Sequence, residues 1–382
     1  MKRRGHLARK PPMRGGTTSA ERIAIFLPTL GGGGAERVAI TLAESFAGRG
    51  YPTDLVLSIA TGPLLANVPA SVRVVDLRSQ RLWTSLLPLI RYRWRNRPAV
   101  VLSLMPLANA LNVISAGLAP RRCRTVLSEH TSRSIAMDRD MSNAGPRLLY
   151  SVCRWAYPKA DAIIAVSSGV AERLRAQLPR AAGAVIAVHN PVPPPEAERK
   201  GKEAKHPWLG DPDTPCLVAM GRLEAEKDPV TMLLVLDALR EDRPVRLLWL
   251  GDGSMRGSME QRRTDLGLDD NVEFLGFRED RLAFLSQADA FLMTSRCEGF
   301  GNVIVEALGL GVPVVSTDCP GPAEILDEGR YGELVAVGDV HALAAAVLEV
   351  LDHPPDAERL RARSRDFDVE TVADRYLEVL GV

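Results

Sequence analysis

The sequence predicts an α/β protein built from two Rossmann-like domains, each with a mainly parallel sheet. Its 382 residues exceed the roughly 250–300 at which one hydrophobic core stops growing. Short apolar runs alternate with helical patterns in both halves, and strands joined by crossover helices form parallel sheets that are covered on both faces. A stretch rich in proline and charge, residues 189–215, separates the halves. Together these observations predict two domains and a linker.

Six strands are predicted in the first half, with helices between several of them. The strands are residues 22–27, 53–58, 72–77, 99–104, 124–128 and 161–166. The helices are residues 35–49, 107–118, 146–157 and 168–177. In the second half the strands are 216–220, 246–250, 271–274 and 290–294, and the helices lie near 229–240 and 255–266. The alternation restarts after the linker, as a second domain requires.

These patterns divide the chain into four parts. Residues 1–20 are expected to be a mobile basic tail, because the first 22 residues carry seven Lys or Arg against one acid. Residues 21–190 are predicted to form the N-terminal domain, and residues 191–365 the C-terminal domain. Residues 366–382 repeat apolar positions on one helical face, which predicts an amphipathic terminal helix.

Composition excludes several classes of protein. A net charge of +1 and 46% hydrophobic residues are typical of a globular protein and argue against a surface that binds nucleic acid. No apolar segment follows the basic start, so we expect no secretory signal and a cytoplasmic protein. The five cysteines are scattered, which predicts neither a disulfide framework nor a zinc site.

The uncharged stretch 98–120 is long enough to cross a bilayer of about 30 Å. However, Pro106, Asn109 and Asn112 interrupt it, and its first part reads as a buried strand followed by a helix. We therefore favour a strand and a helix over a membrane span.

The first candidate site is the glycine run Gly31–Gly34, which follows the first strand and opens the first helix. Glycines let a ligand approach the backbone N–H groups, and a helix N-terminus favours anions. The run does not fit the dinucleotide pattern GxGxxG, because Glu36 and Arg37 stand where glycine is needed. The alternative is a flexible connection without a ligand.

A second candidate is the pair Arg222 and Lys227 on a loop that leaves a strand. Two cations there can converge on one diphosphate, Arg222 as a planar fork and Lys227 as a point charge. The alternative is that both are ordinary surface cations paired with Glu224 or Glu226.

The third candidate is the segment from Glu298 to Glu306, which follows strand 290–294. Its glycines permit a sharp turn, Asn302 is the predicted N-cap, and residues 303–308 form a short helix ended by Gly309 and Gly311. The helix start offers N–H donors to phosphate, and a carboxylate accepts from vicinal sugar or ribose hydroxyls. The alternative is a solvated helix start in which Glu298 complements the dipole.

These segments resemble glycosyltransferase family 4, whose members have the GT-B fold and are retaining and metal-independent. The match covers about residues 20–380, through GGGGAERV, GRLEAEKDP, the GDG of Gly251–Gly253, the E-x7-E element Glu298–Glu306, and PVVSTDCPGPAEIL from Pro313. In this fold the two domains face each other across a cleft, and the terminal helix crosses back to the N-terminal domain. The resemblance implies that residues 21–190 bind the acceptor and that residues 191–365 bind the nucleotide-sugar.

The resemblance implies roles for individual residues. Arg222 and Lys227 would stabilise the leaving diphosphate, Glu298 would contact the donor sugar, and Glu306 would hold the ribose. The other expected donor-binding residues are Gly34, Gly276, Phe277, Arg278, Gly299, Phe300, Gly301 and Asn302, and the acceptor-binding residues are Gly32 and Gly33. His130, after a strand of the first domain, is the remaining catalytic candidate; a loop histidine with satisfied hydrogen bonds is an equal alternative.

The implied activity moves a sugar from a nucleoside diphosphate, UDP favoured over GDP, with retention and without a cofactor or metal. The acceptor is expected to be a glycan or a polyprenyl-diphosphate-linked glycan used for surface polysaccharide. Five arginines, Trp83 and Trp94 in residues 81–97 suggest, together with the basic tail, peripheral attachment to an anionic membrane; the alternative is a basic surface helix. A sugar-nucleotide 2-epimerase and a non-catalytic binding module remain open.

Overall fold

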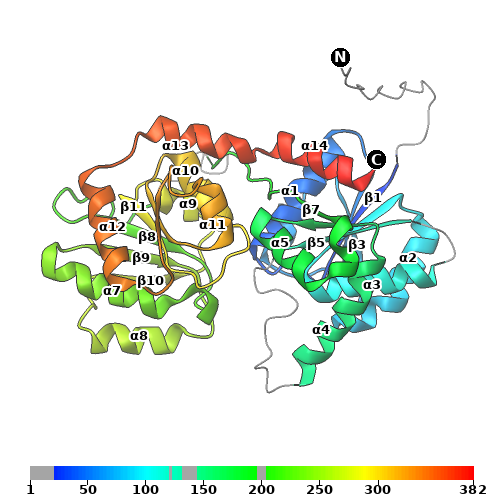
Figure 1. Cartoon of the computed structure of the whole chain (residues 1–382), viewed down its shortest axis with the longest axis horizontal. Helices are drawn as coiled ribbons and strands as arrows, with labels where there is room; N and C mark the ends of the chain where they lie inside the picture. Colours follow the sequence, from blue (N-terminus) through cyan, green and yellow to red (C-terminus); the bar gives the residue numbers. More distant parts are fainter. Residues whose placement is uncertain (1–20, 120–122, 131–143, 196–203) are drawn as a thin grey trace, which may run out of the picture.

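The computed structural model describes residues 21–119, 123–130, 144–195 and 204–382. Two parallel sheets form two lobes that lie side by side, and helices near the C-terminus bridge them along one side (Figure 1). The predicted basic tail, residues 1–20, lies outside the described residues. Within the described part of the chain, the prediction of two Rossmann-like domains is confirmed.

The N-terminal domain contains a seven-stranded sheet in the order β3-β2-β1-β4-β5-β6-β7, with parallel pairing throughout. Its strands are β1 (Ile23–Leu27), β2 (Thr53–Leu57), β3 (Arg73–Asp76), β4 (Val100–Leu104), β5 (Arg124–Glu129), β6 (Ala162–Ala165) and β7 (Val185–Ala187). Its helices are α1 (Gly34–Gly48), α2 (Leu86–Asn96), α3 (Pro106–Leu118), α4 (Ala144–Ala156) and α5 (Ser168–Gln177), with short 3-10 turns η1 (Pro63–Asn67), η2 (Leu82–Ser85), η3 (Tyr157–Lys159) and η4 (Pro179–Ala184).

The C-terminal domain contains a six-stranded parallel sheet in the order β10-β9-β8-β11-β12-β13. Its strands are β8 (Cys216–Met220), β9 (Arg246–Leu250), β10 (Val272–Gly276), β11 (Ala290–Met293), β12 (Val314–Thr317) and β13 (Glu333–Val335). Between them lie η5 (Ala225–Lys227), α7 (Pro229–Asp242), α8 (Arg256–Asp265), α9 (Arg281–Leu285), α10 (Asn302–Leu310) and α11 (Pro320–Ile325). After β13 come α12 (Val340–Asp352), α13 (Ala357–Ser364), η6 (Arg365–Phe367) and α14 (Val369–Leu380).

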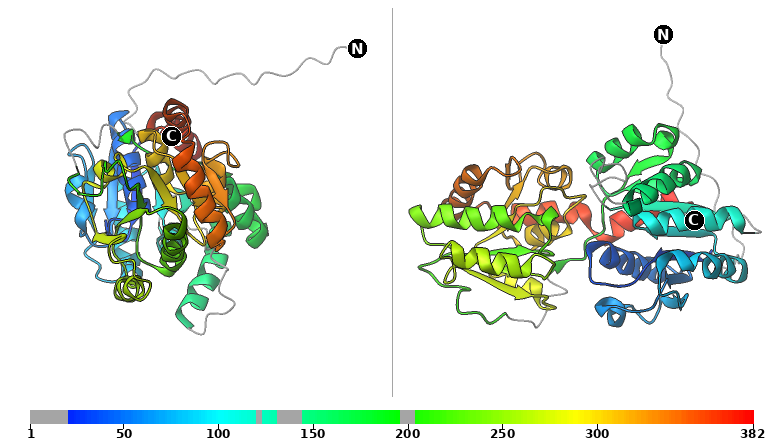
Figure 2. Two further views of the ribbon diagram at one scale, coloured as in Figure 1. Left: turned by 90° about the vertical axis from the view of Figure 1, so that its left-hand side faces the viewer. Right: turned by 90° about the horizontal axis from the view of Figure 1, so that it is seen from below.

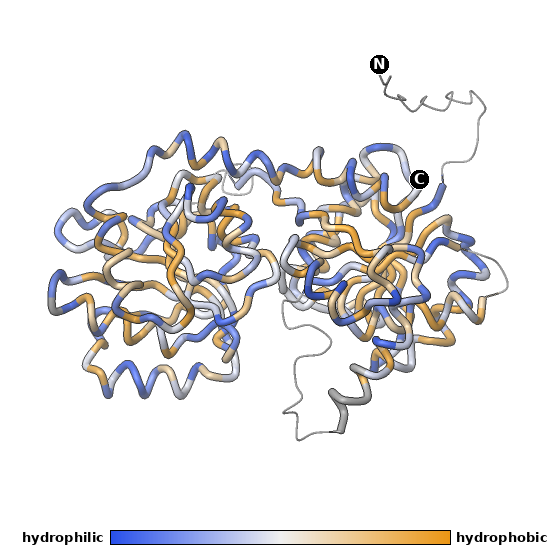
Figure 3. Tube along the Cα trace, in the orientation of Figure 1, coloured by the Kyte–Doolittle hydropathy of each residue, from blue (hydrophilic) through white to orange (hydrophobic). Residues whose placement is uncertain are grey.

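Both sheets are buried on their two faces, which explains their uninterrupted apolar strands. All residues of β1, β4 and β8 are buried. The hydrophobic segments lie inside each lobe and the hydrophilic ones mainly outside (Figure 3). Three hydrophobic clusters lie within one domain each. A fourth cluster is shared, because it joins residues such as Leu127 and Ile163 of the N-terminal domain to Val218 and Phe291 of the C-terminal domain.

Helix α14 crosses from the C-terminal lobe to the N-terminal lobe, as predicted (Figures 1 and 2). Its buried residues, among them Tyr376 and Leu380, join the core that contains β1 and α1. Arg49, the C-cap of α1, forms ion pairs with Glu370 at 2.7 Å and with Asp374 at 3.0 Å. The end of the chain thus forms part of the first domain.

The uncharged stretch 98–120 forms β4 and then the 13-residue helix α3. Asn109 and Asn112 on α3 are buried and hydrogen-bonded to the sheet, Asn109 to Ser128 O at 3.0 Å and Asn112 to Val101 O at 3.0 Å. Among the described residues no helix has the length and apolar character to span a bilayer. The prediction of a strand and a helix is confirmed.

One of the five arginines in residues 81–97 is buried, although the segment was predicted to lie on the surface. Arg93 is buried beneath α2 and donates to Ser115 Oγ at 2.9 Å and to the side chain of Asn112. Leu89 and Tyr92 are buried on the same side of the helix. The other four arginines are exposed, because only one side of α2 faces the domain.

Candidate functional site

The strand order reverses at one place in each sheet, between β1 and β4 and between β8 and β11. In an open parallel sheet, ligands bind beyond the carboxyl ends of the strands at such a point. The glycine run leaves β1, the Arg222–Lys227 loop leaves β8, and the Glu298 segment leaves β11. The three motifs predicted from sequence therefore lie at the two topological switch points.

Hydrogen bonds hold the loop after β8 against the loop after β11. The hydroxyl of Thr294 donates to the carbonyls of Lys227 and Asp228, at 3.1 and 3.0 Å. Arg296 binds the Asp228 carboxylate at 2.9 Å, and that carboxylate also caps α7. These contacts bring Lys227 next to Glu298, and the Lys227 ammonium donates to the Glu298 carboxylate.

Arg222 and Lys227 have different partners. Arg222 is exposed and pairs with Glu226 at 2.9 Å, which is the alternative that the sequence left open for this residue. Lys227 is mostly buried, with 21% of its side chain exposed, and faces a small cavity lined by Met220, Thr294 and Ser295. Of the two cations, only Lys227 is held close to the β11 loop by its own hydrogen bond.

Helix α10 begins one residue earlier than predicted. Gly301 is its N-cap, with a φ of 103° that disfavours other residues, and Asn302 is the first helical residue. The Asn302 side chain does not cap the helix, because its Oδ1 accepts from Asn190 Nδ2 at 2.9 Å. The prediction of Asn302 as N-cap is wrong, but the helix N-terminus does follow Gly299 and Phe300, and Gly311 ends the helix.

Glu306 lies one turn into α10 and is buried, as its apolar neighbours suggested. Arg281 of α9 binds its Oε1 at 2.8 Å, and the side chains are 12% and 9% exposed. Sequence reasoning missed Arg281. The carboxylate that the resemblance assigned to ribose is thus oriented by a buried cation.

The end of β10 supplies Gly276, Phe277 and Arg278, the expected binding segment for the base. Phe277 is 51% exposed. Arg278 pairs with Asp280 at 2.7 Å and lies 4.9 Å from the centre of the Phe284 ring. The Arg278 guanidinium thus has partners within its own domain, whereas Phe277 is half exposed.

The glycine run of the N-terminal domain contacts the C-terminal domain. A Cβ placed on Gly32 would lie 3.7 Å from the Phe277 ring, and one on Gly34 would lie 3.6 Å from Asn302 Nδ2. A Cβ on Gly33 would lie 2.6 Å from the carboxylate of Glu36, so that carboxylate folds back over the loop. The predicted acceptor and donor loops therefore lie side by side.

Glu36 is a charged group of this region that the sequence did not single out. Burial raises the pKa of the Glu36 carboxyl above its ordinary value, while its own backbone N–H and the positive charge of Arg222 act to lower it. Arg222 belongs to the other domain, so its charge reaches across the contact between them.

His130 follows β5, away from the contacts described above. Its Nε2 lies 2.9 Å from Ser128 Oγ, and burial lowers its pKa to about 3, so the ring is neutral near pH 7. This hydrogen bond fits the alternative of a satisfied loop histidine. No contact between His130 and the Lys227–Glu298 pair is present among the described residues.

Comparison with known proteins places both halves in glycosyltransferase families. Residues 32–195 match the model "Glycosyltransferase Family 4", and residues 202–367 match "Glycosyl transferases group 1". The chain thus contains a glycosyltransferase family 4 domain followed by a group 1 glycosyltransferase domain.

Curated relatives of this chain include proteins named as enzymes of glycan assembly. The lipopolysaccharide core biosynthesis glycosyltransferase LpsE of Rhizobium meliloti is 34% identical over 44% of this chain and 50% of LpsE. The chain thus spans about half the length of the first relatives that it matches. A Campylobacter jejuni N-acetylgalactosaminyltransferase that acts on a diphospho-undecaprenol-linked sugar is 24% identical over 94% of this chain and 99% of the relative.

Solved structures with the same GT-B fold cover almost the whole chain. The lipopolysaccharide outer core galactosyltransferase WaaB aligns with a TM-score of 0.70 and 18% identity over 94% of this chain and 99% of WaaB. Anabaena HepE in complex with UDP aligns with a TM-score of 0.73 and 20% identity over the same shares of the two chains.

Proposed function

We propose that this family 4 glycosyltransferase moves a sugar from a nucleoside diphosphate, UDP in preference to GDP, to a glycan or polyprenyl-diphosphate-linked acceptor with retention. Its place would be the cytoplasmic assembly of a surface polysaccharide or glycoconjugate. The single observation that carries the proposal is the Lys227–Glu298 pair beside the N-terminus of α10. At this place Lys227 and the backbone N–H groups would bind the diphosphate of the donor. Glu298 would bind its sugar, and Glu306 would bind its ribose.

The relatives support this choice of substrates. HepE has been solved with UDP-glucose, and the Campylobacter relative transfers N-acetylgalactosamine to a diphospho-undecaprenol-linked sugar. Phe277 offers an exposed ring on which a nucleobase can stack.

In the proposed reaction the bond between the anomeric carbon and the β-phosphate oxygen breaks. A bond from the acceptor hydroxyl oxygen forms on the same face, and its proton passes to the leaving phosphate. Negative charge develops on the diphosphate, where Lys227, Arg222 and the N–H groups at the start of α10 stabilise it. No side chain needs to act as nucleophile, and a neutral His130 would act only as a hydrogen-bonding group.

Binding and turnover measurements test the proposal separately. Calorimetry with UDP, GDP, ADP and their sugars should identify one tight nucleotide. Incubation of the matching donor with a lipid-linked glycan extract should then release nucleoside diphosphate and lengthen the glycan. Release of an epimerised sugar without acceptor would indicate a 2-epimerase, and binding without any turnover would indicate a binding module.

The exposed side of α2 supports a second part of the proposal, attachment to an anionic membrane. Leu87, Arg91 and Trp94 follow a helical spacing of four and three, and Trp83 lies on the preceding turn; the three apolar side chains are 60–75% exposed. No acid occurs between Asp76 and Glu129, a segment that contains nine arginines. Exposed tryptophan beside arginine is typical of an interfacial helix.

Liposome flotation at low salt tests this attachment. Vesicles with phosphatidylglycerol should carry the wild-type chain, and pure phosphatidylcholine should not. The double change R91E/R95E should abolish flotation, whereas R243E, on a surface arginine of the other domain that pairs with Asp352, should leave it intact. Equal flotation of all three proteins would contradict the attachment of α2.

A further inference from the structure

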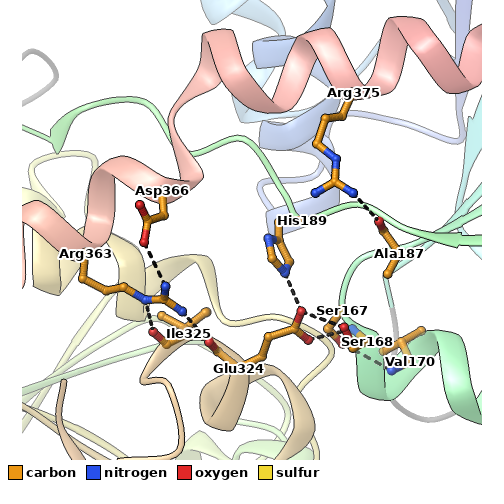
Figure 4. A network of polar contacts seen from close by, with 10 residues as sticks. All are labelled: Ser167, Ser168, Val170, Ala187, His189, Glu324, Ile325, Arg363, Asp366 and Arg375. Atoms are coloured by element: carbon orange, nitrogen blue, oxygen red, sulfur yellow. Dashed lines mark hydrogen bonds and ion pairs between the residues drawn. The ribbon is translucent and has the colours of Figure 1, made fainter. Parts of the chain in front are cut away.

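His189 lies in the linker between the domains and is held by three contacts. Its Nε2 is 2.5 Å from Glu324 Oε1 (Figure 4). Its ring stacks on Phe300 at 5.5 Å between centroids and meets the edge of Phe367 at 5.2 Å. Phe300 belongs to the loop from Glu298 to Asn302, here called the donor loop. A linker side chain thus packs directly against the proposed donor site.

Glu324, the partner of His189, joins the two domains. It lies on α11 of the C-terminal domain, and its carboxylate accepts from the backbone N–H of Ser168 at 2.6 Å and from the Ser168 hydroxyl at 3.0 Å (Figure 4). Ser168 is the first residue of α5 in the N-terminal domain, so the carboxylate also meets the positive end of that helix. This contact is made only while the two domains are together.

The same short helix supports the donor loop. A Cβ on Gly321 of α11 would lie 2.4 Å from the carbonyl oxygen of Phe300, so the loop backbone rests directly on α11. Arg363 fixes the other end of α11 by donating to the carbonyls of Glu324 and Ile325, at 2.7 and 2.8 Å. Movement of Glu324 would therefore be transmitted to the loop.

The linker residue after His189 holds the far end of the donor loop. Asn190 donates to Asn302 Oδ1 at 2.9 Å. Two consecutive linker residues, His189 and Asn190, thus contact Phe300 and Asn302, the two neighbours of Gly301. Gly301 is the N-cap of α10, and the N–H groups next to it are the ones proposed to bind the diphosphate.

We propose that His189 is a positioning residue that couples the donor loop to the contact between the domains. When α5 engages Glu324, the carboxylate fixes the imidazole, and the imidazole fixes Phe300 and with it the start of α10. When the domains separate, Glu324 loses both donors of Ser168, and the donor loop loses a fixed neighbour. The inference rests on the proposed function, because that function makes the donor loop part of the binding site for the nucleotide-sugar.

The test breaks the contact from the side of the other domain. Ser168→Pro removes both donors to Glu324, and proline is tolerated at the first position of a helix after an extended residue, as Ser167 is, with φ −154° and ψ 162°. H189A removes the stacking ring, and H189Q keeps a hydrogen-bond donor without it. H206Q is the matched control, because His206 pairs with Glu273 at 3.0 Å within one domain.

Two readouts follow the donor loop: the affinity for UDP, and the rate at which iodoacetamide labels Cys297, the partly exposed residue before Glu298. We expect S168P and H189A each to weaken UDP binding about tenfold and to speed labelling, because each breaks a hydrogen bond to a charged group. The double variant should be no worse than H189A alone. H206Q should match the wild type in both readouts.

Wild-type UDP affinity and labelling rates in S168P and H189A would overturn the inference while leaving the proposed function intact. A wild-type chain that binds no nucleoside diphosphate would instead refute the proposed function. The labelling rates without nucleotide still decide the coupling in that case. Circular dichroism checks that each variant folds. H189Q should weaken UDP binding as H189A does, because both lose the ring that stacks on Phe300; wild-type affinity in H189Q would contradict the role of that ring.

Discussion

The ammonium of Lys227 donates to the carboxylate of Glu298, although 71 positions separate the two residues in the chain. Their loops leave β8 and β11, the neighbouring strands between which the order of the sheet reverses. A donor diphosphate bound at this point would replace Glu298 as the partner of the Lys227 ammonium. The Glu298 carboxylate could then accept hydrogen bonds from the sugar hydroxyls.

Replacing Lys227 by alanine should weaken UDP binding by at least about tenfold, because a charge-assisted contact to the diphosphate is lost. Isothermal titration calorimetry measures the effect. R243A removes an exposed, ion-paired arginine of the same domain and should keep wild-type affinity. Unchanged binding in both K227A and E306A would remove the donor-site assignment.

Removing Arg281 should destabilise the C-terminal domain. Arg281→Ala leaves the buried Glu306 carboxylate without this ion pair, and loss of one partner of such a pair costs about 3–5 kcal/mol. Urea unfolding measures the change in the free energy of unfolding. R330A, on an exposed pair with Asp327, should cost less than about 1 kcal/mol; equal effects of the two variants would contradict the buried ion pair.

Truncating Tyr376 tests the crossing of α14. This ring is fully buried in the core of the N-terminal domain, and Tyr376→Ala should cost about 3–5 kcal/mol, as other large-to-small aromatic changes do. Urea unfolding again reports the loss. Glu378→Ala on the exposed side of the same helix should be close to neutral, and a similar cost for both would mean that α14 is not docked there.

Lowering the pH should reduce the free energy of unfolding through His130, whose pKa is lowered to about 3 in the folded protein. An unfolded histidine takes up a proton below about pH 6.5 and the folded one does not. The stability that depends on the neutral ring is therefore complete above pH 6.5 and is lost as the pH falls from there toward 3. His130→Gln should show a smaller loss of unfolding free energy between pH 7 and 5 than the wild type; identical pH slopes would contradict the neutral assignment.

The sequence predicted the sheets well where strands are long and buried. The bounds of β8, β9 and α5 agree with the prediction to the residue, because apolar runs between polar turns leave little choice of register. Three strands, β7, β12 and β13, were not predicted, since runs of three or four residues are too short to show a period. The helices α9, α11, α12 and α13 were also missed. In α11, Pro320 and Pro322 mask a helix of only six residues.

The candidate site was predictable as a set of motifs but not as a set of contacts. Lys227 and Glu298 were both singled out, and nothing in the chain pattern shows that they pair. Arg281 and His189 could not be assigned, because their roles come from tertiary neighbours, Glu306 and Phe300. The predicted cap at Asn302 failed for the same reason, since Asn190 occupies its side chain.

A crystal structure of the chain with UDP tests the central claim most directly. The diphosphate should lie within hydrogen-bonding distance of Lys227 Nζ and of the backbone N–H groups at the start of α10, with the ribose hydroxyls at Glu306. A diphosphate bound only to the loop Gly31–Gly34, out of reach of Lys227, would contradict it.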